Sequence, residues 1–184
     1  ARIHFATDEL SILNGQRTNG KWTFNLATLD AVSGIVRHHE VFPGADNLNP
    51  EEDAEGNIVF LSNRDGYRNL YRYNTYDETV TQLTDLITGV SGITHYAPAF
   101  SIDRFRNRIV YTYFSSQGYR LYSARPEDLL TEVVDPQAVD MSAAQLPRVN
   151  RKAPRLVDPS LALLQTPENI PLVTTTEVPY KPKF

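Results

Sequence analysis

Residues 58–62 (Ile-Val-Phe-Leu-Ser) and residues 109–113 (Ile-Val-Tyr-Thr-Tyr) are two copies of one strand pattern. Each is followed, after a turn, by a second strand pattern: Leu-Tyr-Arg-Tyr at 70–73 and Leu-Tyr-Ser-Ala at 121–124. Both patterns therefore recur 51 positions later, 109 against 58 and 121 against 70. A looser copy opens the chain, with Ile-His-Phe-Ala-Thr starting at Ile3. Repetition at this period is typical of supersecondary units that stack on copies of themselves, as in propellers and solenoids.

Glycine-containing turn signals separate these strand patterns. They are Asn14-Gly15, Asn19-Gly20, Asp65-Gly66 and Gln117-Gly118. Glycine tolerates the positive φ that a tight reversal needs, so each pair predicts a hairpin-type turn, and Gly66 in particular is expected at positive φ. The first copy has eight additional residues at 8–15, which predict a longer loop on the same frame.

Each hairpin is followed by a further strand pattern, at 34–41, 79–84 and 130–134, and the last two hairpins are preceded by extended segments with a proline, at 48–50 and 97–100. One unit therefore holds four short strands, which is the organisation of a propeller blade. The predicted fold class is all-β, a partial propeller of about three four-stranded blades. Within 1–134 the predicted units are an incomplete blade at 1–46, which lacks its innermost strand, a blade at 47–86 and a blade at 95–134. Single helical turns are expected at 126–130 and 142–146.

The last part of the sequence, 135–184, differs in composition. It holds eight of the twelve prolines and has no long period-2 run. Proline-rich segments favour extended backbone without a core of their own, so this part predicts an extended connector or tail, with one apolar patch at 160–164. The chain begins directly in a strand pattern without an initiator methionine or signal peptide, which is typical of a processed, excised or incomplete chain.

Composition excludes several function classes. The net charge is −4 with both signs interspersed, so nucleic acid is not an expected partner. The absence of cysteine excludes disulfides, thiolate catalysis and cysteine-ligated metal. No apolar run approaches the roughly 18–20 residues that a membrane-spanning helix needs.

Residues 58–84 resemble the TolB-type β-propeller repeat. The repeat has a strand ending in Ser-x-Arg-Asp-Gly, a strand of the form Ile-Tyr and a closing Leu-Thr. The resemblance covers roughly 3–134, and the chain departs from the pattern at the first turn of the unit, at 53–56 and at 101–104. The residues of the second unit that keep the pattern are Ser62, Arg64, Asp65, Gly66, Leu70, Tyr71, Leu83 and Thr84.

A narrower resemblance starts directly after this closing Leu-Thr. Residues 88–94 (Thr-Gly-Val-Ser-Gly-Ile-Thr) are similar to large bacterial envelope proteins in which a metallopeptidase-like domain precedes the propeller and an outer-membrane-type barrel follows it. The last residues, 180–184, look like the join into that barrel. The resemblance implies a periplasmic or cell-envelope location in a Gram-negative-type bacterium, with the remaining blades or another protein as the partner.

The implied function is a non-catalytic binding or scaffolding module. An alternative is the accessory, substrate-gating propeller of a peptidase whose catalytic domain lies outside this chain. A third is a propeller glycosidase, which would need two or three carboxylates converging near a central channel. No cofactor is expected for any of the three.

Motifs for catalysis and metal binding are incomplete in this sequence. Ser91 stands in Gly-Val-Ser-Gly-Ile, which lacks the last glycine of a nucleophile elbow. His38 and His39 are neighbours in a predicted strand, so they point to opposite faces and cannot hold one ion. Residues 51–56 resemble the start of a calcium loop, but the twelfth position is Ser62, where a bidentate glutamate is needed. The sequence therefore predicts no catalytic and no metal-binding residue.

The candidate ligand-facing residues come from the predicted inner strands and the loops beside them: Asn47, Asn49, Tyr96 and Phe100. Arg64, Asp65 and Gly66 are predicted as a structural turn, in which Asp65 bonds nearby backbone amides.

Overall fold

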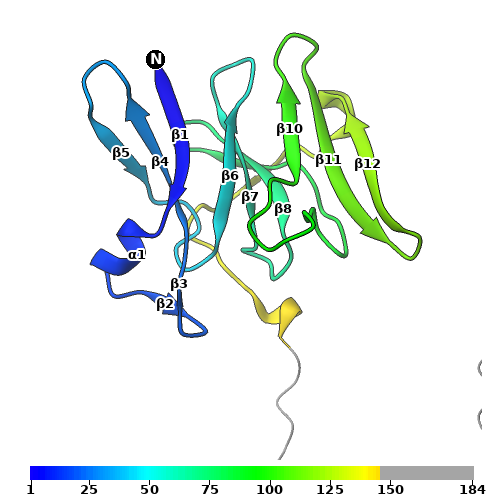
Figure 1. Ribbon diagram of the computed structural model, residues 1–184, viewed down its shortest axis with the longest axis horizontal. Helices are drawn as coiled ribbons and strands as arrows, with labels where there is room; N and C mark the ends of the chain where they lie inside the picture. The colour runs from blue at the N-terminus through cyan, green and yellow to red at the C-terminus, as the bar shows by residue number, and fades with distance from the viewer. Residues whose placement is uncertain (146–184) are drawn as a thin grey trace, which may run out of the picture. The chain divides into compact units, whose positions relative to one another are not determined.

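In the computed structural model, residues 1–145 are described, and they form an all-β fold in which three antiparallel sheets stand side by side (Figure 1). This confirms the predicted fold class at the level of all-β. No sheet closes on itself within these residues. The three sheets follow one another along the chain, and the central one lies between the other two.

Except for β13, the strands of the three sheets follow the order of the chain. The first sheet has the order β1-β4-β5, the central sheet β6-β7-β8-β9-β13 and the third sheet β10-β11-β12. The strands are β1 (Arg2–Thr7), β4 (Asn25–Asp30), β5 (Val36–His39), β6 (Asn47–Glu52), β7 (Ile58–Ser62), β8 (Asn69–Tyr73), β9 (Val80–Gln82), β10 (Phe100–Asp103), β11 (Arg108–Ser115), β12 (Gly118–Ala124) and β13 (Glu132–Val134). The other elements are the hairpin of β2 (Arg17–Thr18) and β3 (Lys21–Trp22), the helix α1 (Glu9–Leu13) and two 3₁₀ turns, η1 (Pro126–Asp128) and η2 (Ser142–Ala144).

The sequence repeat is also a repeat of strand pairing. Phe60 of β7 pairs with Tyr71 of β8, and 51 positions later Tyr111 of β11 pairs with Tyr122 of β12. The two hairpins thus have the same register, which is expected when the same alternating apolar pattern is buried in the same way. Gly66 has a φ of +90° in the first hairpin, as predicted, and its N–H donates to the Asn63 carbonyl at 2.8 Å.

Two details of the predicted units differ from the structure. The additional residues of the first copy form the helix α1 rather than a plain loop. The strand at the end of the third unit, β13, does not join its own sheet. It pairs with β9 of the central sheet, where Val134 lies opposite Val80. The turn η1 brings the chain back to this sheet, where the N–H of Leu130 donates to the Leu83 carbonyl at 3.0 Å, and β13 then covers an edge that would otherwise be unpaired.

The central sheet is buried on both faces. Strand β7 is fully buried, and its side chains alternate between two cores because successive residues of a strand point to opposite faces. Ile58 and Phe60 belong to the core shared with the first sheet and the segment after it, whereas Val59 and Leu61 belong to the core shared with the third sheet. The first core comprises Leu26, Val41, Phe42, Ala45, Ile58, Phe60, Tyr71, Tyr73 and Val80. The second comprises Leu48, Val59, Leu61, Leu70, Leu83, Val90, Ala99, Phe100 and Ile109.

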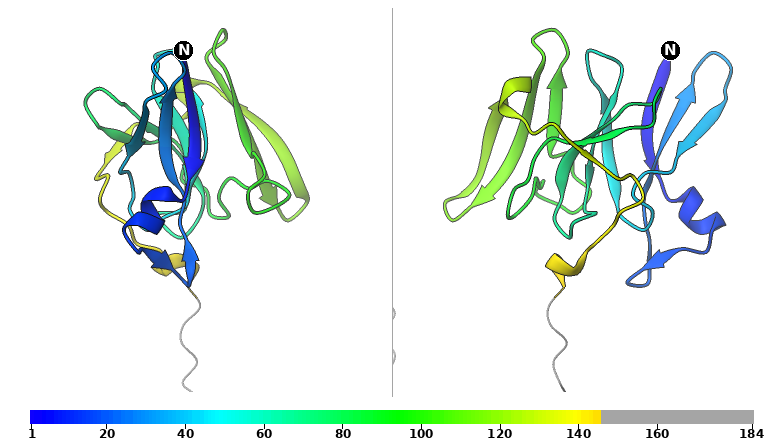
Figure 2. Two further views of the ribbon diagram at one scale, coloured as in Figure 1. Left: turned by 60° about the vertical axis from the view of Figure 1, so that its left-hand side comes forward. Right: turned by 180° about the vertical axis from the view of Figure 1, so that it is seen from behind.

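The chain after β12 crosses behind the central sheet, as the view from behind in Figure 2 shows. Val134, Val139 and Met141 pack against the first core, and the N–H of Asp140 donates to the Arg64 carbonyl at 2.8 Å. The described part of the predicted connector, 135–145, is therefore held on the surface of the sheets. The rest of it, with the apolar patch at 160–164, lies outside the described residues. Among the residues that the structure describes, no helix is long and apolar enough to cross a membrane.

Candidate functional site

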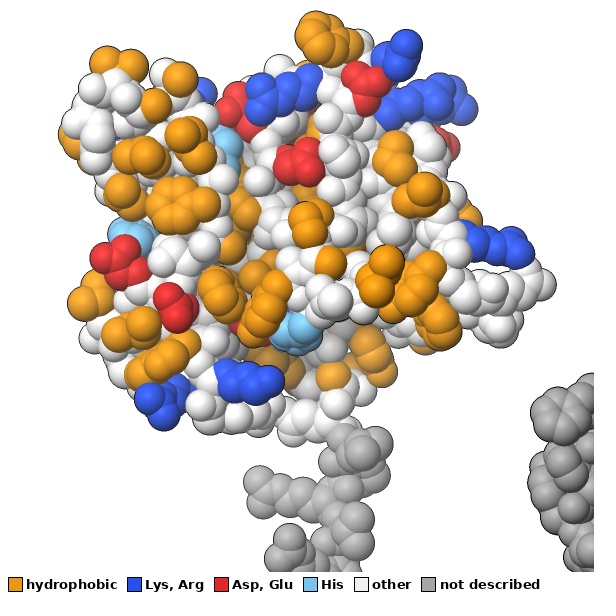
Figure 3. All heavy atoms as spheres, viewed as in Figure 1, with side chains coloured by type: hydrophobic (Ala, Val, Ile, Leu, Met, Phe, Trp, Pro, Cys, Tyr) orange, Lys and Arg blue, Asp and Glu red, His pale blue; other side chains and the backbone are white. Residues whose placement is uncertain are grey.

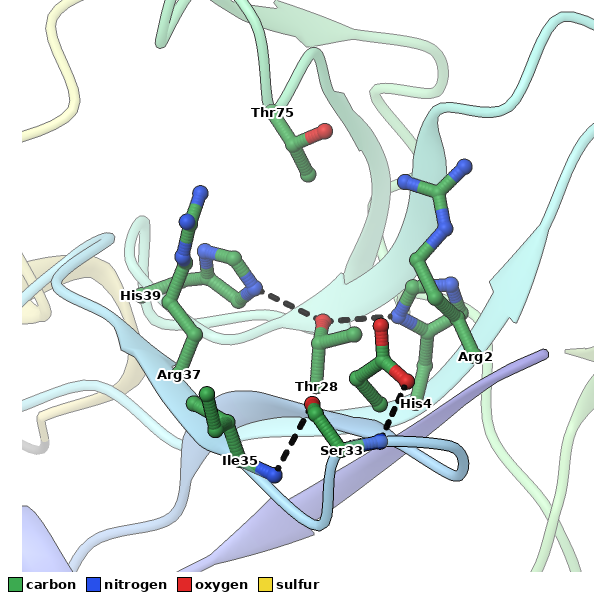
Figure 4. A pocket seen from close by; sticks show the side chains of 9 residues that line it. Arg2, His4, Thr28, Ser33, Ile35, Arg37, His39 and Thr75 are labelled. Atoms are coloured by element: carbon green, nitrogen blue, oxygen red, sulfur yellow. Dashed lines mark hydrogen bonds between the residues drawn. The ribbon is translucent and has the colours of Figure 1, made fainter.

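A pocket lined mainly by polar residues lies on the face of the first sheet that is turned toward the central sheet. Its volume is about 290 Å³, and Figure 4 shows it with Thr75, which follows β8, on the side opposite the sheet. The residues that line it are Arg2, His4, Thr28, Asp30, Ser33, Ile35, Arg37, His39 and Thr75.

Strand pairing places the polar side chains of this pocket on one face. His4 of β1 lies directly opposite Thr28 of β4, and Thr28 lies opposite Arg37 of β5. His39 is two positions further along β5 and therefore points to the same side as Arg37. Three neighbouring strands thus present their side chains to one cavity.

A continuous chain of hydrogen bonds forms the floor of the pocket. Nε2 of His39 lies 2.8 Å from Oγ1 of Thr28, which in turn lies 2.9 Å from Nδ1 of His4. Nε2 of His4 then reaches Oε2 of Glu52 at 3.0 Å. Since Glu52 belongs to β6, this chain joins the first sheet to the central sheet. His39 and Thr28 are buried, so these hydrogen bonds are largely shielded from water.

The charge of the end groups fixes the direction of this chain. The hydrogen bond from His4, with a further contribution from Arg104, lowers the pKa of Glu52, so its carboxylate is an acceptor and Nε2 of His4 is the donor. Burial above all, and then the nearby His4 and Arg37, lower the pKa of His39 to about 4, so its imidazole is neutral at pH 7. In the tautomer of His4 that carries its single proton on Nε2, the Thr28 hydroxyl donates to Nδ1 of His4 and accepts from Nε2 of His39. The resulting tautomer of His39 leaves its Nδ1 as an acceptor, and none of the described residues bonds it.

Two arginines stand at the sides of the pocket (Figure 4). Arg2 and Arg37 make no ion pair with a described residue, so both guanidinium groups keep their charge available. Asp30 also lines the pocket, but its carboxylate accepts the N–H groups of Val32 at 2.8 Å and Ser33 at 3.1 Å, and these bonds lower its pKa. The pocket therefore combines two free cations with a carboxylate that already has partners.

The four residues predicted to face a ligand lie in different surroundings. Asn47 is buried and its Nδ2 donates to the Val41 carbonyl at 2.7 Å, and Phe100 is buried in the second core. Asn47 is in β6 and Phe100 in β10, each at an edge of its sheet, and both side chains point into the protein. Asn49 lies in a bulge of β6 with a φ of +51°. Tyr96 is half exposed and lines a different, smaller pocket of about 210 Å³, where its ring meets Phe24.

The predicted structural turn is present, with different partners for Asp65. Its carboxylate accepts Nε of Arg64 at 2.6 Å and the hydroxyl of Tyr71, both of them side-chain donors, and not the backbone amides that were expected. Asp53, in the calcium-like segment, makes such amide bonds instead, to the N–H groups of Glu55 and Asn57. That segment is a turn, as predicted.

Sequence reasoning missed the pocket. It placed His38 and His39 on opposite faces, which the structure confirms, since His39 turns inward while Nε2 of His38 lies 3.3 Å from a carboxylate oxygen of Glu9. It gave no role to His4, Thr28 or Glu52, because no motif links them. The only available signal was a pair of polar residues at alternate positions in each of three strands, namely Arg2 and His4, Thr28 and Asp30, and Arg37 and His39.

Acidification should destabilise the protein through His39. Its pKa is about 4 when folded and about 6.5 in the unfolded chain, so the unfolded state binds the additional proton between these values. The stabilisation from neutral His39 is fully present above pH 6.5 and is lost as the pH falls toward 4, by up to about 3 kcal/mol. Urea unfolding at a series of pH values measures this slope.

His39→Gln should flatten the slope between pH 6.5 and 4.5, and His38→Gln, the neighbouring histidine on the other face, should leave it unchanged. An equal slope in the wild type and His39→Gln would contradict the burial argument. The carboxylates with lowered pKa values, Asp30 and Glu52 among them, lose their contribution as the pH falls below about 5, so the slope above that pH is free of them.

Within residues 1–145, no three histidine or acidic side chains are arranged to hold a metal ion. A comparison of the sequence with models of known protein families found no match, and a comparison with curated proteins found none either.

Proposed function

We propose that residues 1–134 are three neighbouring blades of a TolB-type β-propeller, and that the chain is a non-catalytic binding or scaffolding module. The observation that supports this proposal is the stacking of three repeated sheets, in which the central one is buried on both faces and each outer one on a single face. Stacking of this kind continues until a ring closes or a cap covers the last face.

The open face of the third sheet carries the same residues that are buried in the central sheet. Leu70 of β8 is fully buried, and its counterpart 51 positions later, Leu121 of β12, is 74% exposed. Val59 of β7 is buried, whereas its counterpart Val110 of β11 is exposed. Phe114 and Tyr119 extend this exposed face, with their rings 5.0 Å apart. Apolar side chains at positions that face the next sheet elsewhere in the repeat favour a further blade that buries them.

The first sheet has a similar open face. Ile3 of β1 is 53% exposed, and Val36 of β5 is also exposed, on the side away from the central sheet. Figure 3 shows hydrophobic side chains over the first and third sheets at the two sides of the view. We infer that neighbouring blades of the same larger protein, or a partner protein, cover both faces.

The wider context of the proposal rests on the resemblance to the TolB-type repeat and to envelope proteins that carry it. On that basis the module belongs to the periplasm or cell envelope of a Gram-negative-type bacterium. A non-catalytic role agrees with the surroundings of Ser91, whose carbonyl accepts the Thr112 hydroxyl at 2.6 Å in a loop beside β11. No residue in this loop supplies a nucleophile elbow.

Self-association of the 184-residue chain tests the stacking. We expect oligomers, or a monomer of low stability, in size-exclusion chromatography with light scattering, because both end faces are apolar. Leu121→Lys places a charge on the open face and should shift the population toward monomer. Ile87→Lys, which changes an equally exposed residue outside the strands, should not.

A stable monomer would contradict the proposal. If the wild-type chain is monomeric and unfolds cooperatively at about 45–65 °C, and Leu121→Lys behaves as the wild type does, the third sheet needs no cover and the chain is not part of a larger stack.

A further inference from the structure

We propose that the pocket on the first sheet binds a small hydroxylated acid, a molecule with one carboxylate or phosphate group and a neighbouring hydroxyl. In this site Arg2 and Arg37 hold the oxyanion, and Nδ1 of His39 accepts a hydrogen bond from the ligand's hydroxyl. The inference deepens the binding role proposed above by naming a ligand class, and it does not depend on the number of blades.

The charge of the pocket selects an anion. Its two guanidinium groups lie on either side of the cavity and have no carboxylate within 4 Å among the described residues. Guanidinium groups bind carboxylate and phosphate through charge-assisted hydrogen bonds, which are stronger than neutral ones. Asp30 is the one carboxylate in the lining, and it accepts hydrogen bonds from the amides of Val32 and Ser33. An anion between Arg2 and Arg37 therefore does not have to displace Asp30 from either arginine.

The floor of the pocket selects a donor on the same ligand. His39 is fixed by its bond to Thr28, which is itself fixed by His4 and Glu52, so the orientation of the imidazole does not depend on a ligand. Its free ring nitrogen, Nδ1, offers one lone pair. No described residue bonds this nitrogen, and His39 lines the cavity, so Nδ1 can accept a hydrogen bond from a ligand hydroxyl. An anion without a hydroxyl does not make this bond.

The size and the other lining groups favour a compact, polar molecule. The cavity of about 290 Å³ lies at the lower end of the range of ligand pockets. Ser33 and Thr75 add hydroxyl groups on opposite sides, and Ile35 is the one apolar side chain of the lining. A single sugar-sized acid matches this combination better than an aromatic or lipid-like ligand.

Calorimetric titration of the full chain with four probes tests the ligand class. Glucuronate and glucose 6-phosphate carry both the oxyanion and hydroxyl groups, glucose lacks the charge, and acetate lacks the hydroxyl. We expect the two hydroxylated acids to bind at least tenfold more tightly than glucose or acetate at low salt, with a loss of affinity as salt screens the arginines. A preference between the two acids then separates a carboxylate ligand from a phosphate ligand.

Variants assign the two roles. Arg37→Gln should weaken binding of both hydroxylated acids about tenfold or more. Arg108→Gln should have no effect, because Arg108 is exposed on β11 and makes no ion pair with a described residue. His39→Gln should reduce the advantage of glucuronate over acetate while leaving the weak binding of acetate unchanged. Far-UV circular dichroism of each variant shows whether it is folded.

Three results would overturn the proposal: no binding of either acid at millimolar concentration, binding of glucose as tight as that of glucuronate, or an unchanged affinity in folded Arg37→Gln. Ligand titration and the self-association measurement above have separate readouts. Failure of the blade stacking therefore leaves the result for the pocket intact, and failure of ligand binding leaves the stacking intact.

Discussion

Phe60→Ala is expected to lower the free energy of unfolding by about 3–5 kcal/mol, the largest loss at any single position of the central sheet. Phe60 is fully buried in β7, and its ring centroid lies 5.9 Å from that of Tyr71 and 6.1 Å from that of Phe42. The substitution removes contacts with β8 and with the segment after the first sheet at once, and leaves a cavity between them. Urea unfolding followed by circular dichroism measures the loss.

Phe105→Ala is the matched control. Phe105 lies in the turn between β10 and β11 with its side chain completely exposed, so the same chemical change should alter stability by less than about 0.5 kcal/mol. Since small domains have only about 5–15 kcal/mol in total, Phe60→Ala can leave too little folded protein to measure. Ile58→Val, two positions away in the same core, should then lose about 0.5–1.5 kcal/mol. Equal stabilities of the Phe60 and Phe105 variants would show that the central sheet is not the core.

The repeated hairpins could be predicted because their signals are local. The alternation of apolar residues in β7 and β11, and a glycine such as Gly66 or Gly118 at positive φ in or beside the turn, specify each hairpin within about fifteen residues of sequence. The pairing of Phe60 with Tyr71, and of Tyr111 with Tyr122, follows from these signals alone. Positions of strands within one hairpin are therefore the part of this fold that the sequence determines most directly.

The partner of β13 could not be predicted in the same way. Its sequence indicates a strand, but nothing within Glu132–Val134 specifies which edge it joins. The choice depends on where η1 directs the chain and on the free edge of β9, both of which are properties of the folded sheets. Period-2 patterns identify a strand and its two faces, not its neighbour.

The direction of side chains on β6 was also beyond the pattern. Asn47 was expected to face a ligand, but β6 has a register shift between Leu48 and Glu51, with Asn49 at a φ of +51° inside it. A bulge adds one residue to a strand and so changes which side chains share a face on either side of it. Asn47 itself precedes the shift and points into the protein because both faces of the sheet are covered at this end of β6, and its Oδ1 has no partner among the described residues.

The pocket joins residues that are far apart in the chain. The bonds of its floor link positions separated by 11, 24 and 48 residues and connect two different sheets. Histidine, threonine and glutamate at such distances form no motif, and each is ordinary in a strand when considered alone. Sites assembled across stacked sheets depend on the packing of the sheets, which only the structure supplies.

Gly89→Ala is expected to lower the free energy of unfolding by about 2–4 kcal/mol, far more than the loss of one backbone conformation. Gly89 precedes the buried Val90, whose N–H donates to the Arg68 carbonyl at 2.5 Å, and it has a φ of +68°. A Cβ at this position would lie 2.4 Å from the carbonyl oxygen of Arg68 and 2.8 Å from its backbone nitrogen. Backbone atoms of a paired segment cannot move aside as a flexible side chain can, so the overlap adds to the cost of positive φ.

Gly15→Ala separates these two contributions. Gly15 has nearly the same φ, +65°, but a Cβ there would meet nothing within 4 Å. Its replacement should cost about 1 kcal/mol, from the positive φ alone. The difference between the two variants in urea unfolding is then the cost of separating the loop at Gly89 from Arg68, and with it Val90 from the core between the central and third sheets. Equal losses at both glycines would show that the loop adapts without disturbing that core, and that the contact between Val90 and the two sheets does not hold the third sheet in place.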